Sequence, residues 1–366
     1  MKQLLLLFLV LPTLLLAGCS DRMELDQSSI VTITGIDLDE SAHLTIQNMV
    51  LVFNEDAKSK ELLLDAKSSS LRKSRLVTQS KSNGNMMIGK LQLILVSKKL
   101  LKKMDLFPQL DVAYRDAKVS NSAIIATCDC SIVRLLSTKL DAHPILTEFI
   151  RSLIVSGHNS DITVETTMQK FHYFRFEKGI NAYISEIKLD NNEISIAGTA
   201  LLKNDRKYAT LLNKAESTLL LILQKDFKAP AIYSTNLTID GEKMVMSSDI
   251  IKASPKIKTA FADDRFQFNI DLPIDLQITE LTDDADAVND RVKIEQLVKE
   301  QVDKELSALI RKLQKNKTDP IGLGLYARAF QYKHWKNVQD DWSQAFSEAE
   351  ITIVPKVTIK RYGVIK

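Results

Sequence analysis

The segment FQFNIDLPIDLQI, residues 266–278, alternates apolar and polar side chains from its first position to its last. Successive side chains of a strand point to opposite faces of a sheet, so this period of two places one face in a core and the other in water. Pro273 falls on the polar side and indicates an edge or a bend, because proline has no N–H to donate. The segment therefore predicts a long strand of an antiparallel sheet with one solvated face.

A long amphipathic helix is predicted further along the chain, from about Asn289 to Lys315. Its apolar residues recur at steps of three and four: Ile294, Leu297, Val298, Val302, Leu306, Leu309, Ile310 and Leu313. Lysine and glutamate occupy many of the other positions. A single apolar stripe on a helix of this length is typical of packing against a sheet, so we expect the helix to lie across the strand at residues 266–278.

Hairpin patterns occur in both halves of the chain. Residues 29–37 and 43–53 read as paired strands, as do residues 232–239 and 243–251, which flank the turn pair Asp240-Gly241. The pattern at residues 208–223 does not separate helix from strand. Further expectations are a helix at 55–78, a strand at 86–96, a helix at 163–176, and a strand pair at 350–355 and 357–365.

These patterns predict an α+β fold with several domains, in which mixed or antiparallel sheets each pack against helices. We place a signal peptide at residues 1–18 and an N-terminal α/β region, with room for two subdomains, at residues 19–193. A C-terminal α+β domain at residues 194–366 would hold the long helix. The strand pattern at residues 194–203 marks its predicted start.

The chain begins with MKQLLLLFLVLPTLLLAGCS, which has the pattern of a bacterial lipoprotein signal. Lys2 is followed by an apolar run, residues 4–16, that is shorter than the roughly 20 residues needed to span a membrane. Small residues precede Cys19, whose thiol can be acylated. We predict that Cys19 is the lipidated N-terminus, carrying a diacylglyceryl group and an N-acyl chain, because stable anchoring takes two or more chains. The alternative is an ordinary secretory signal followed by a chance cysteine.

Charge and cysteine content limit the classes of function. The formal net charge is +3, and residues 1–18 contribute only Lys2 to it, so there is no overall case for nucleic-acid binding. Beyond Cys19 the cysteines are Cys128 and Cys130. In a strand, two thiols at this spacing point the same way, so we expect buried free thiols and no disulfide, with soft-metal binding as the weaker alternative.

Several motifs suggest chemistry without completing a site. Gly84–Lys90 fits G-x-x-x-x-G-K, but Leu91 stands where a phosphate loop needs Ser or Thr, and no helix pattern follows. The five histidines have no metal-ligating spacing. An acidic cluster, which lacks the glycine of a calcium loop and is interpreted as the start of the long helix, comprises Asp283, Asp284, Asp286 and Asp290. No catalytic residue, metal or cofactor is therefore predicted.

Two surface features each have two interpretations. A basic run at residues 67–81 is either a solvated helix face or a face for anionic lipid headgroups. Trp335 and Trp342 lie seven residues apart and would share one face of a helix. Buried packing is the default for such a pair, and a partner-binding face is the alternative, because aromatic residues are enriched at binding hot spots.

The C-terminal motifs resemble those of a known family. Asp319-Pro320-Ile321-Gly322-Leu323-Gly324 is followed by Trp335-Lys336, Trp342, strand-like residues 351–359 and Arg361-Tyr362-Gly363. The opening at residues 21–37, the segment at 88–115 and Ile196–Lys203 fit the same family in the same order. This ordered set, together with the lipoprotein signal, resembles the Ger(x)C spore germination lipoproteins, the C subunits of nutrient germinant receptors.

The resemblance implies a body of several mixed α/β domains, with no enzymatic activity and no cofactor. It implies assembly with two integral-membrane partners, the A-type and B-type receptor subunits, on the outer surface of the spore inner membrane. The candidate residues for a partner interface or structural motif are Asp319, Pro320, Gly322, Gly324, Trp335 and Trp342. The alternatives are a solute-binding lipoprotein that delivers a small ligand to a membrane transporter, and a cell-envelope hydrolase. The germinant, the partner surface and the stoichiometry stay open.

Overall fold

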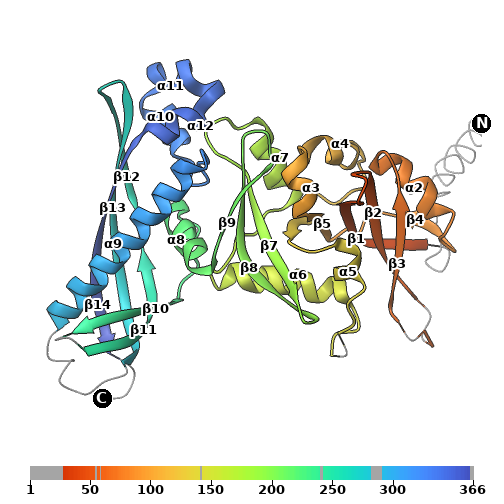
Figure 1. Ribbon diagram of the computed structural model, residues 1–366, viewed down its shortest axis with the longest axis horizontal. Helices are drawn as coiled ribbons and strands as arrows, with labels where there is room; N and C mark the ends of the chain where they lie inside the picture. The colour runs from red at the N-terminus through yellow and green to blue at the C-terminus, as the bar shows by residue number, and fades with distance from the viewer. Residues whose placement is uncertain are drawn as a thin grey trace, which may run out of the picture.

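The computed structural model contains two sheets, one in each half of the chain, joined through a buried helix (Figure 1). The structure describes residues 28–53, 56–57, 59–140, 142–239, 242–281 and 291–362. The predicted signal peptide, Cys19 and the acidic cluster at residues 283–290 lie outside these residues. Helices and mixed sheets in both halves confirm the predicted α+β class.

The N-terminal sheet is mixed and runs in the order β3-β2-β1-β5-β6-β7-β8-β9, with β4 also paired to β1. β1, β5, β6 and β7 are parallel neighbours, whereas both outer flanks are antiparallel. The strands are β1 (Ser28–Leu38), β2 (Leu44–Leu51), β3 (Glu61–Lys67), β4 (Asn85–Met87), β5 (Leu93–Ser97), β6 (Ile124–Cys128), β7 (Tyr183–Asp190), β8 (Glu193–Leu202) and β9 (Tyr208–Leu212). The pairing of β1 with β2 confirms the first predicted hairpin.

Helices cover both faces of this sheet, which explains why its central strands are apolar throughout. α5 (Ile132–Leu136) and α6 (Leu146–Asn159) pack on the face that carries Leu93 and Leu95. The opposite face, which carries Ile94, packs against α3, α4 and α7, and α2 lies beside them (Figure 1). Their bounds are α2 (Leu71–Gln79), α3 (Lys98–Lys103), α4 (Phe107–Arg115) and α7 (Met168–Phe176).

The C-terminal sheet is built around the strand that the alternating pattern predicted. β13 (Arg265–Leu281) pairs with β11 and β12 on one side and with β14 on the other. Its apolar residues from Phe266 to Ile278 are buried, which confirms the predicted faces. The other strands are β10 (Ala231–Ile239), β11 (Glu242–Ala253), β12 (Lys256–Ala262) and β14 (Glu350–Tyr362). β10 and β11 confirm the second predicted hairpin.

Pro273 lies in the middle of the central strand and not at an edge. On one side it aligns with Lys356 of β14, and on the other it faces the junction at which β11 ends and β12 begins. Its carbonyl accepts a hydrogen bond from Ser254 N at 3.3 Å. The missing N–H therefore falls where no continuous neighbouring strand requires a donor.

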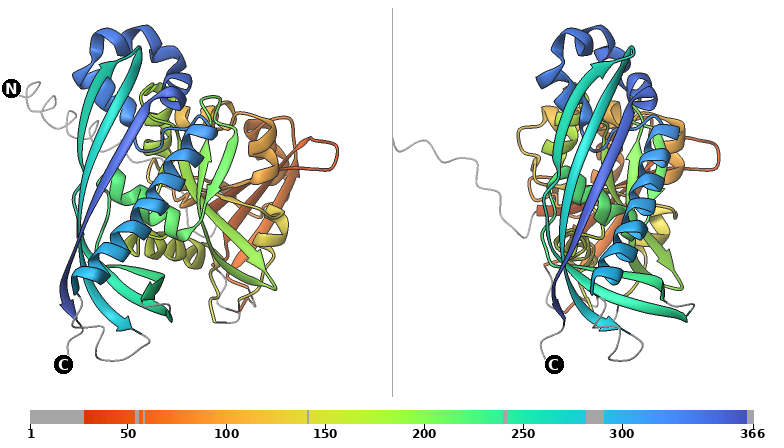
Figure 2. Two further views of the ribbon diagram at one scale, coloured as in Figure 1. Left: turned by 60° about the vertical axis from the view of Figure 1, so that its left-hand side comes forward. Right: turned by 90° about the vertical axis from the view of Figure 1, so that its left-hand side faces the viewer.

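α9 (Arg291–Lys315) is the predicted long helix, and it lies across one face of the C-terminal sheet (Figure 2). Its apolar stripe is buried at Ile294, Val298, Val302, Leu306, Leu309, Ile310 and Leu313. α10 (Leu323–Phe330), α11 (Tyr332–Val338), η3 (Gln339–Asp341) and α12 (Trp342–Glu348) follow at one end of the sheet (Figure 1).

α8 (Lys214–Gln224) connects the two sheets and is buried at every position from Ser217 to Leu223. An apolar core runs without interruption from the N-terminal sheet past α8 to α9. The domain boundary predicted between residues 193 and 194 lies at the start of β8, directly after the turn from β7, whereas the two sheets divide the chain between Leu212 and Ala231.

Four local expectations are wrong in part. Residues 55–78, predicted as a helix, contain β3 before α2, and residues 86–96 contain the end of β4, a turn and most of β5. The helix predicted at residues 163–176 begins only at Met168. The final strand pair is one strand, β14, because Pro355 and Lys356 align with β13 without a turn. The unresolved pattern at residues 208–223 divides into β9 and α8.

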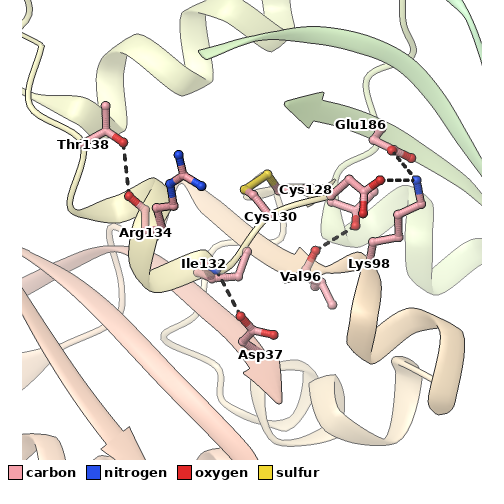
Figure 3. The surroundings of a disulfide bond; sticks show 11 residues. Asp37, Val96, Lys98, Cys128, Cys130, Ile132, Arg134, Thr138 and Glu186 are labelled. Atoms are coloured by element: carbon pink, nitrogen blue, oxygen red, sulfur yellow. Dashed lines mark hydrogen bonds and ion pairs between the residues drawn. A yellow bond between two sulfur atoms is a disulfide. The ribbon is translucent and has the colours of Figure 1, made fainter. Parts of the chain in front are cut away.

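Cys128 and Cys130 form a disulfide, which corrects the expectation of free thiols (Figure 3). Cys128 is the last residue of β6, and the chain bends at Asp129 and Cys130, so the strand alternation does not reach the second cysteine. The two Cα atoms lie 5.2 Å apart, within the usual range for a disulfide. The bend is held to α3 by an ion pair of 2.9 Å between Lys98 and Asp129.

Candidate functional site

Asp319 is the centre of the sequence motif in the folded chain. It lies between the end of α9 and the start of α10, and none of its surface is exposed. Among the described residues no cation pairs with its carboxylate, so N–H donors must satisfy the oxygens. The structure supplies three such donors, and all belong to the C-terminal domain.

The donors come from the motif itself and from the second tryptophan. Oδ1 of Asp319 accepts from the backbone N–H of Gly322 at 2.8 Å. Oδ2 accepts from the backbone N–H of Gly324 at 2.9 Å and from Nε1 of Trp342 at 2.9 Å. The carboxylate therefore closes the turn before α10 and fixes the first residue of α12 against it.

Burial raises the pKa of the Asp319 carboxyl above its ordinary value of 3.8. The hydrogen bonds from Gly324, Trp342 and Gly322 oppose this effect, because they favour the ionised form. Burial is the larger of the two effects, so the net shift is upward.

The backbone of Asp319 also binds the N-terminal half of the chain. Its N–H donates to Oδ1 of Asn181 at 2.7 Å, and its carbonyl accepts from the N–H of Asn181 at 2.8 Å. Asn181 is buried and stands two residues before β7. This pair of hydrogen bonds joins the start of a central strand in the first sheet to the turn that opens α10.

The two glycines of the motif serve different purposes. Gly322 has a φ of +83°, a conformation that side chains rarely adopt, and it precedes the first residue of α10. Gly324 allows close backbone contact, because a Cβ there would lie 2.6 Å from both Cα and O of Gly179 and 2.7 Å from Cε2 of Trp342. The segment at residues 179–181 therefore packs directly on the first turn of α10.

Trp342 and Trp335 are both buried, but they lie in separate helices, not on one helix face. The Trp342 ring meets Phe266 edge-on at 5.2 Å between centroids. The guanidinium of Arg328 lies 5.6 Å from the Trp335 ring centroid. A partner could not reach either ring in this structure, and the exposed aromatic residues nearby are Phe330 and Tyr332.

Polar contacts surround this junction between the two halves. Arg328 of α10 pairs with Glu177 at 2.9 Å, and Lys178 pairs with Asp340 at 2.6 Å. Gln224, at the end of α8, donates from Nε2 to the carbonyl of Pro320 at 2.7 Å. Lys312 of α9 pairs with Glu216 of α8 at 2.7 Å. The first two contacts join the two halves directly, and the other two join α8 to the C-terminal half.

The structure brings Asp319, Gly322, Gly324 and Trp342 into direct contact, and the carbonyl of Pro320 binds Gln224. Trp335 lies in α11, with its ring near Arg328 of α10. The predicted lipidation site, Cys19, lies outside the described residues. Asn181 and Gly179 were not predicted as members. No spacing or motif in the sequence links residues 179 and 181 to residue 319.

This arrangement stabilises structure, because both buried oxygens of the Asp319 carboxylate accept hydrogen bonds from N–H donors of the chain itself. In the part of the chain that the structure describes, no group of three or more His, Cys, Asp or Glu side chains could hold a metal ion. None of the described helices is both long enough and apolar enough to cross a membrane. The hydrogen bonds between the Asp319 backbone and Asn181, together with those its carboxylate accepts, make this site a structural junction between the two halves.

Comparison with known proteins covers nearly the whole chain. Residues 21–189 match the family described as spore germination protein N-terminal domain, and residues 197–363 match spore germination B3/GerAC like, C-terminal. Spore germination protein GerQC of Bacillus cereus is 21% identical over 98% of both chains. Spore germination protein YndF of Bacillus subtilis (strain 168) is 22% identical over 75% of this chain and 68% of its own length.

The fold has a counterpart among solved structures. The crystal structure of the GerBC protein matches with a TM-score of 0.61 and 17% identity, covering 89% of this chain and 96% of that one. The two domain families match in order along the chain, and the GerQC match spans both of them. The chain therefore belongs to the GerC family of spore germination proteins.

Proposed function

We propose that this chain is a non-catalytic, lipid-anchored subunit of a spore germinant receptor. In this proposal, acyl chains on Cys19 hold the body at the outer face of the spore inner membrane, where it assembles with integral-membrane A-type and B-type subunits. The observation that carries the proposal is the match of both halves of the chain to germination protein families. The lipoprotein signal at residues 1–19 supplies the means of attachment.

The architecture supports a role in assembly. The apolar core and the Asp319 junction join the two halves into one unit. β1 begins at Ser28, nine positions after Cys19. Even a fully extended connection keeps the start of β1 within roughly 30 Å of the anchor. The body would therefore stay close enough to the bilayer to contact membrane-embedded partners.

Substitution of the anchor residue tests this proposal. We expect Cys19→Ala to move the protein from the membrane fraction to the soluble fraction of spore lysates, because its body would lose the acyl chains that bind the bilayer. Mass spectrometry of the wild-type N-terminal peptide should show diacylglyceryl modification at Cys19. Cys128→Ala with Cys130→Ala is the control and should leave the protein in the membrane fraction. An unmodified Cys19 thiol in the wild type would contradict the proposal.

A further inference from the structure

A cavity of about 810 Å³ opens between α2, α4 and the face of the N-terminal sheet. This volume is within the range of small-molecule sites. Its floor is apolar and belongs to the core, with Ile36, Ile46 and Ile94 at most 2% exposed. Leu76 of α2 lines the same cavity and is 76% exposed, so an apolar side chain stands in water at the opening. The cavity is separate from the Asp319 junction.

The lining carries an excess of positive charge. Four cationic residues contribute to the lining, Arg72, Lys73, Arg75 and Arg115, against one acidic residue, Asp116. Arg75 lies 3.7 Å from Asp116, and Arg115 pairs with Asp111, which is not part of the lining. The side chains of Arg72 and Lys73 are exposed and make no hydrogen bond or ion pair with the described residues.

A polar pair interrupts the apolar floor. Asn48 is 6% exposed and lines the cavity, and its Oδ1 accepts from the hydroxyl of Thr34 at 3.0 Å. The Asn48 amide nitrogen has no hydrogen bond among the described residues, yet it is not sealed from solvent. A largely buried amide with a free donor offers a second hydrogen-bonding point inside the cavity.

We infer that this cavity binds an amphiphile with an apolar chain and an anionic head group. The chain would lie on the isoleucine floor, where burial of apolar surface is favourable. The anionic group would pair with Arg72 and Lys73, which we call the rim of the cavity and which have no carboxylate partner in the part of the chain that the structure describes. Apolar packing alone would accept a cationic or neutral amphiphile equally well. The positive charge of Arg72 and Lys73 therefore selects a ligand whose head group is negatively charged. This inference holds whether or not the chain is a receptor subunit.

The test uses the full chain in nanodiscs of zwitterionic phospholipid and a palmitic acid that carries a mid-chain diazirine. After irradiation, peptide mass spectrometry locates the adducts. We expect them to concentrate on residues 71–79, 86–94 and 110–119, which contribute to the lining. Arg72→Glu with Lys73→Glu should lower this labelling about tenfold, as expected for loss of a charge-assisted contact. Lys102→Glu with Lys103→Glu on α3, which makes the same charge change away from the cavity, should leave it unchanged.

Two further arms make the result decisive. An alkyl amine with the same chain and diazirine should label these peptides about tenfold less than the acid does, because its head group is repelled by the rim. Ala113→Trp, which places a large ring in the cavity from α4, should abolish labelling by the acid. The inference is overturned if adducts spread over exposed apolar residues such as Ile232 and Phe330, if the amine labels equally, or if reversing the rim charge has no effect. If Ala113→Trp lowers the melting temperature, its loss of labelling could come from unfolding, and the test then rests on Arg72→Glu with Lys73→Glu.

Discussion

At the scale of single residues, Asp319 shows how a buried carboxylate can be kept without a cation. Three N–H donors from Gly322, Gly324 and Trp342 take the place of a positive charge, and the Asp319 backbone binds Asn181. Removing the carboxylate would leave those donors buried without an acceptor. Because unsatisfied buried polar groups are costly, this one side chain should matter more than the exposed ion pairs around it.

Asp319→Ala should lower the free energy of unfolding by about 3 kcal/mol or more, since it leaves several donors unpaired and opens a small cavity. Urea denaturation followed by circular dichroism measures the change. Asp340→Ala is the matched control, because Asp340 also joins the two halves of the chain, through Lys178, but is 83% exposed. It should cost no more than about 0.5 kcal/mol. Equal losses for the two variants would show that the buried network adds nothing.

The raised pKa of Asp319 predicts a dependence of stability on pH. When the folded-state pKa lies above the ordinary value of 3.8, the unfolded chain releases its proton first as pH rises. The stability that this group contributes is therefore fully present below pH 3.8 and is lost as pH rises through the folded-state pKa. The difference in unfolding free energy between wild type and Asp319→Ala should shrink over that interval. A difference that stays constant or grows with pH is the contrary result.

The residues of the junction differ in how far the sequence could predict them. Asp319, Gly322, Gly324 and Trp342 stand within one recognisable motif, so their grouping was predictable by resemblance. Asn181 was not, because its link to Asp319 spans 138 positions and depends on how the two sheets meet. The tryptophans were expected on one helix face, but helix ends and η3 intervene between them.

At the scale of elements, β13 and α9 were predictable because each carries its own periodicity over many residues. Period two along β13 and steps of three and four along α9 report burial directly, and the structure buries those faces. Shorter elements gave weaker signals. β3 lies in the segment at residues 55–78, for which the sequence pattern predicted only a helix. The pattern also predicted two strands that separate after Pro355, whereas the pairing of β14 with β13 continues through that residue. The bend after Cys128 allows a disulfide that strand geometry alone had excluded.

Leu306→Ala on α9 tests the packing of this helix on the sheet. Leu306 is fully buried, so truncation should lower the free energy of unfolding by about 2–5 kcal/mol through lost burial and a residual cavity. Lys304→Ala on the exposed side of the same helix should change it by less than about 0.5 kcal/mol. Thermal and urea denaturation of both variants make the comparison. A loss below 1 kcal/mol for Leu306→Ala, roughly that of a surface change, would mean that α9 is loosely packed.

At the scale of the whole molecule, the chain is a two-sheet body whose halves share a core and a buried polar junction. Resemblance along the sequence predicted the family, because its motifs occur in order over nearly the whole chain. The way the halves meet could not be predicted, since α8 and residues 179–181 carry no periodic or motif signal for that contact. A shared core and a buried junction of this kind are consistent with the assembly role proposed above.

Affinity capture from spore inner membranes tests the assembly role most directly. The full chain, tagged at its C-terminus, would be recovered after mild solubilisation and its partners identified by quantitative mass spectrometry. We expect two multi-pass membrane proteins, corresponding to the A-type and B-type subunits, to be recovered in amounts comparable to the tagged chain. Recovery of the chain alone, or together with the subunits of a solute transporter in place of the two receptor subunits, would contradict the proposed function.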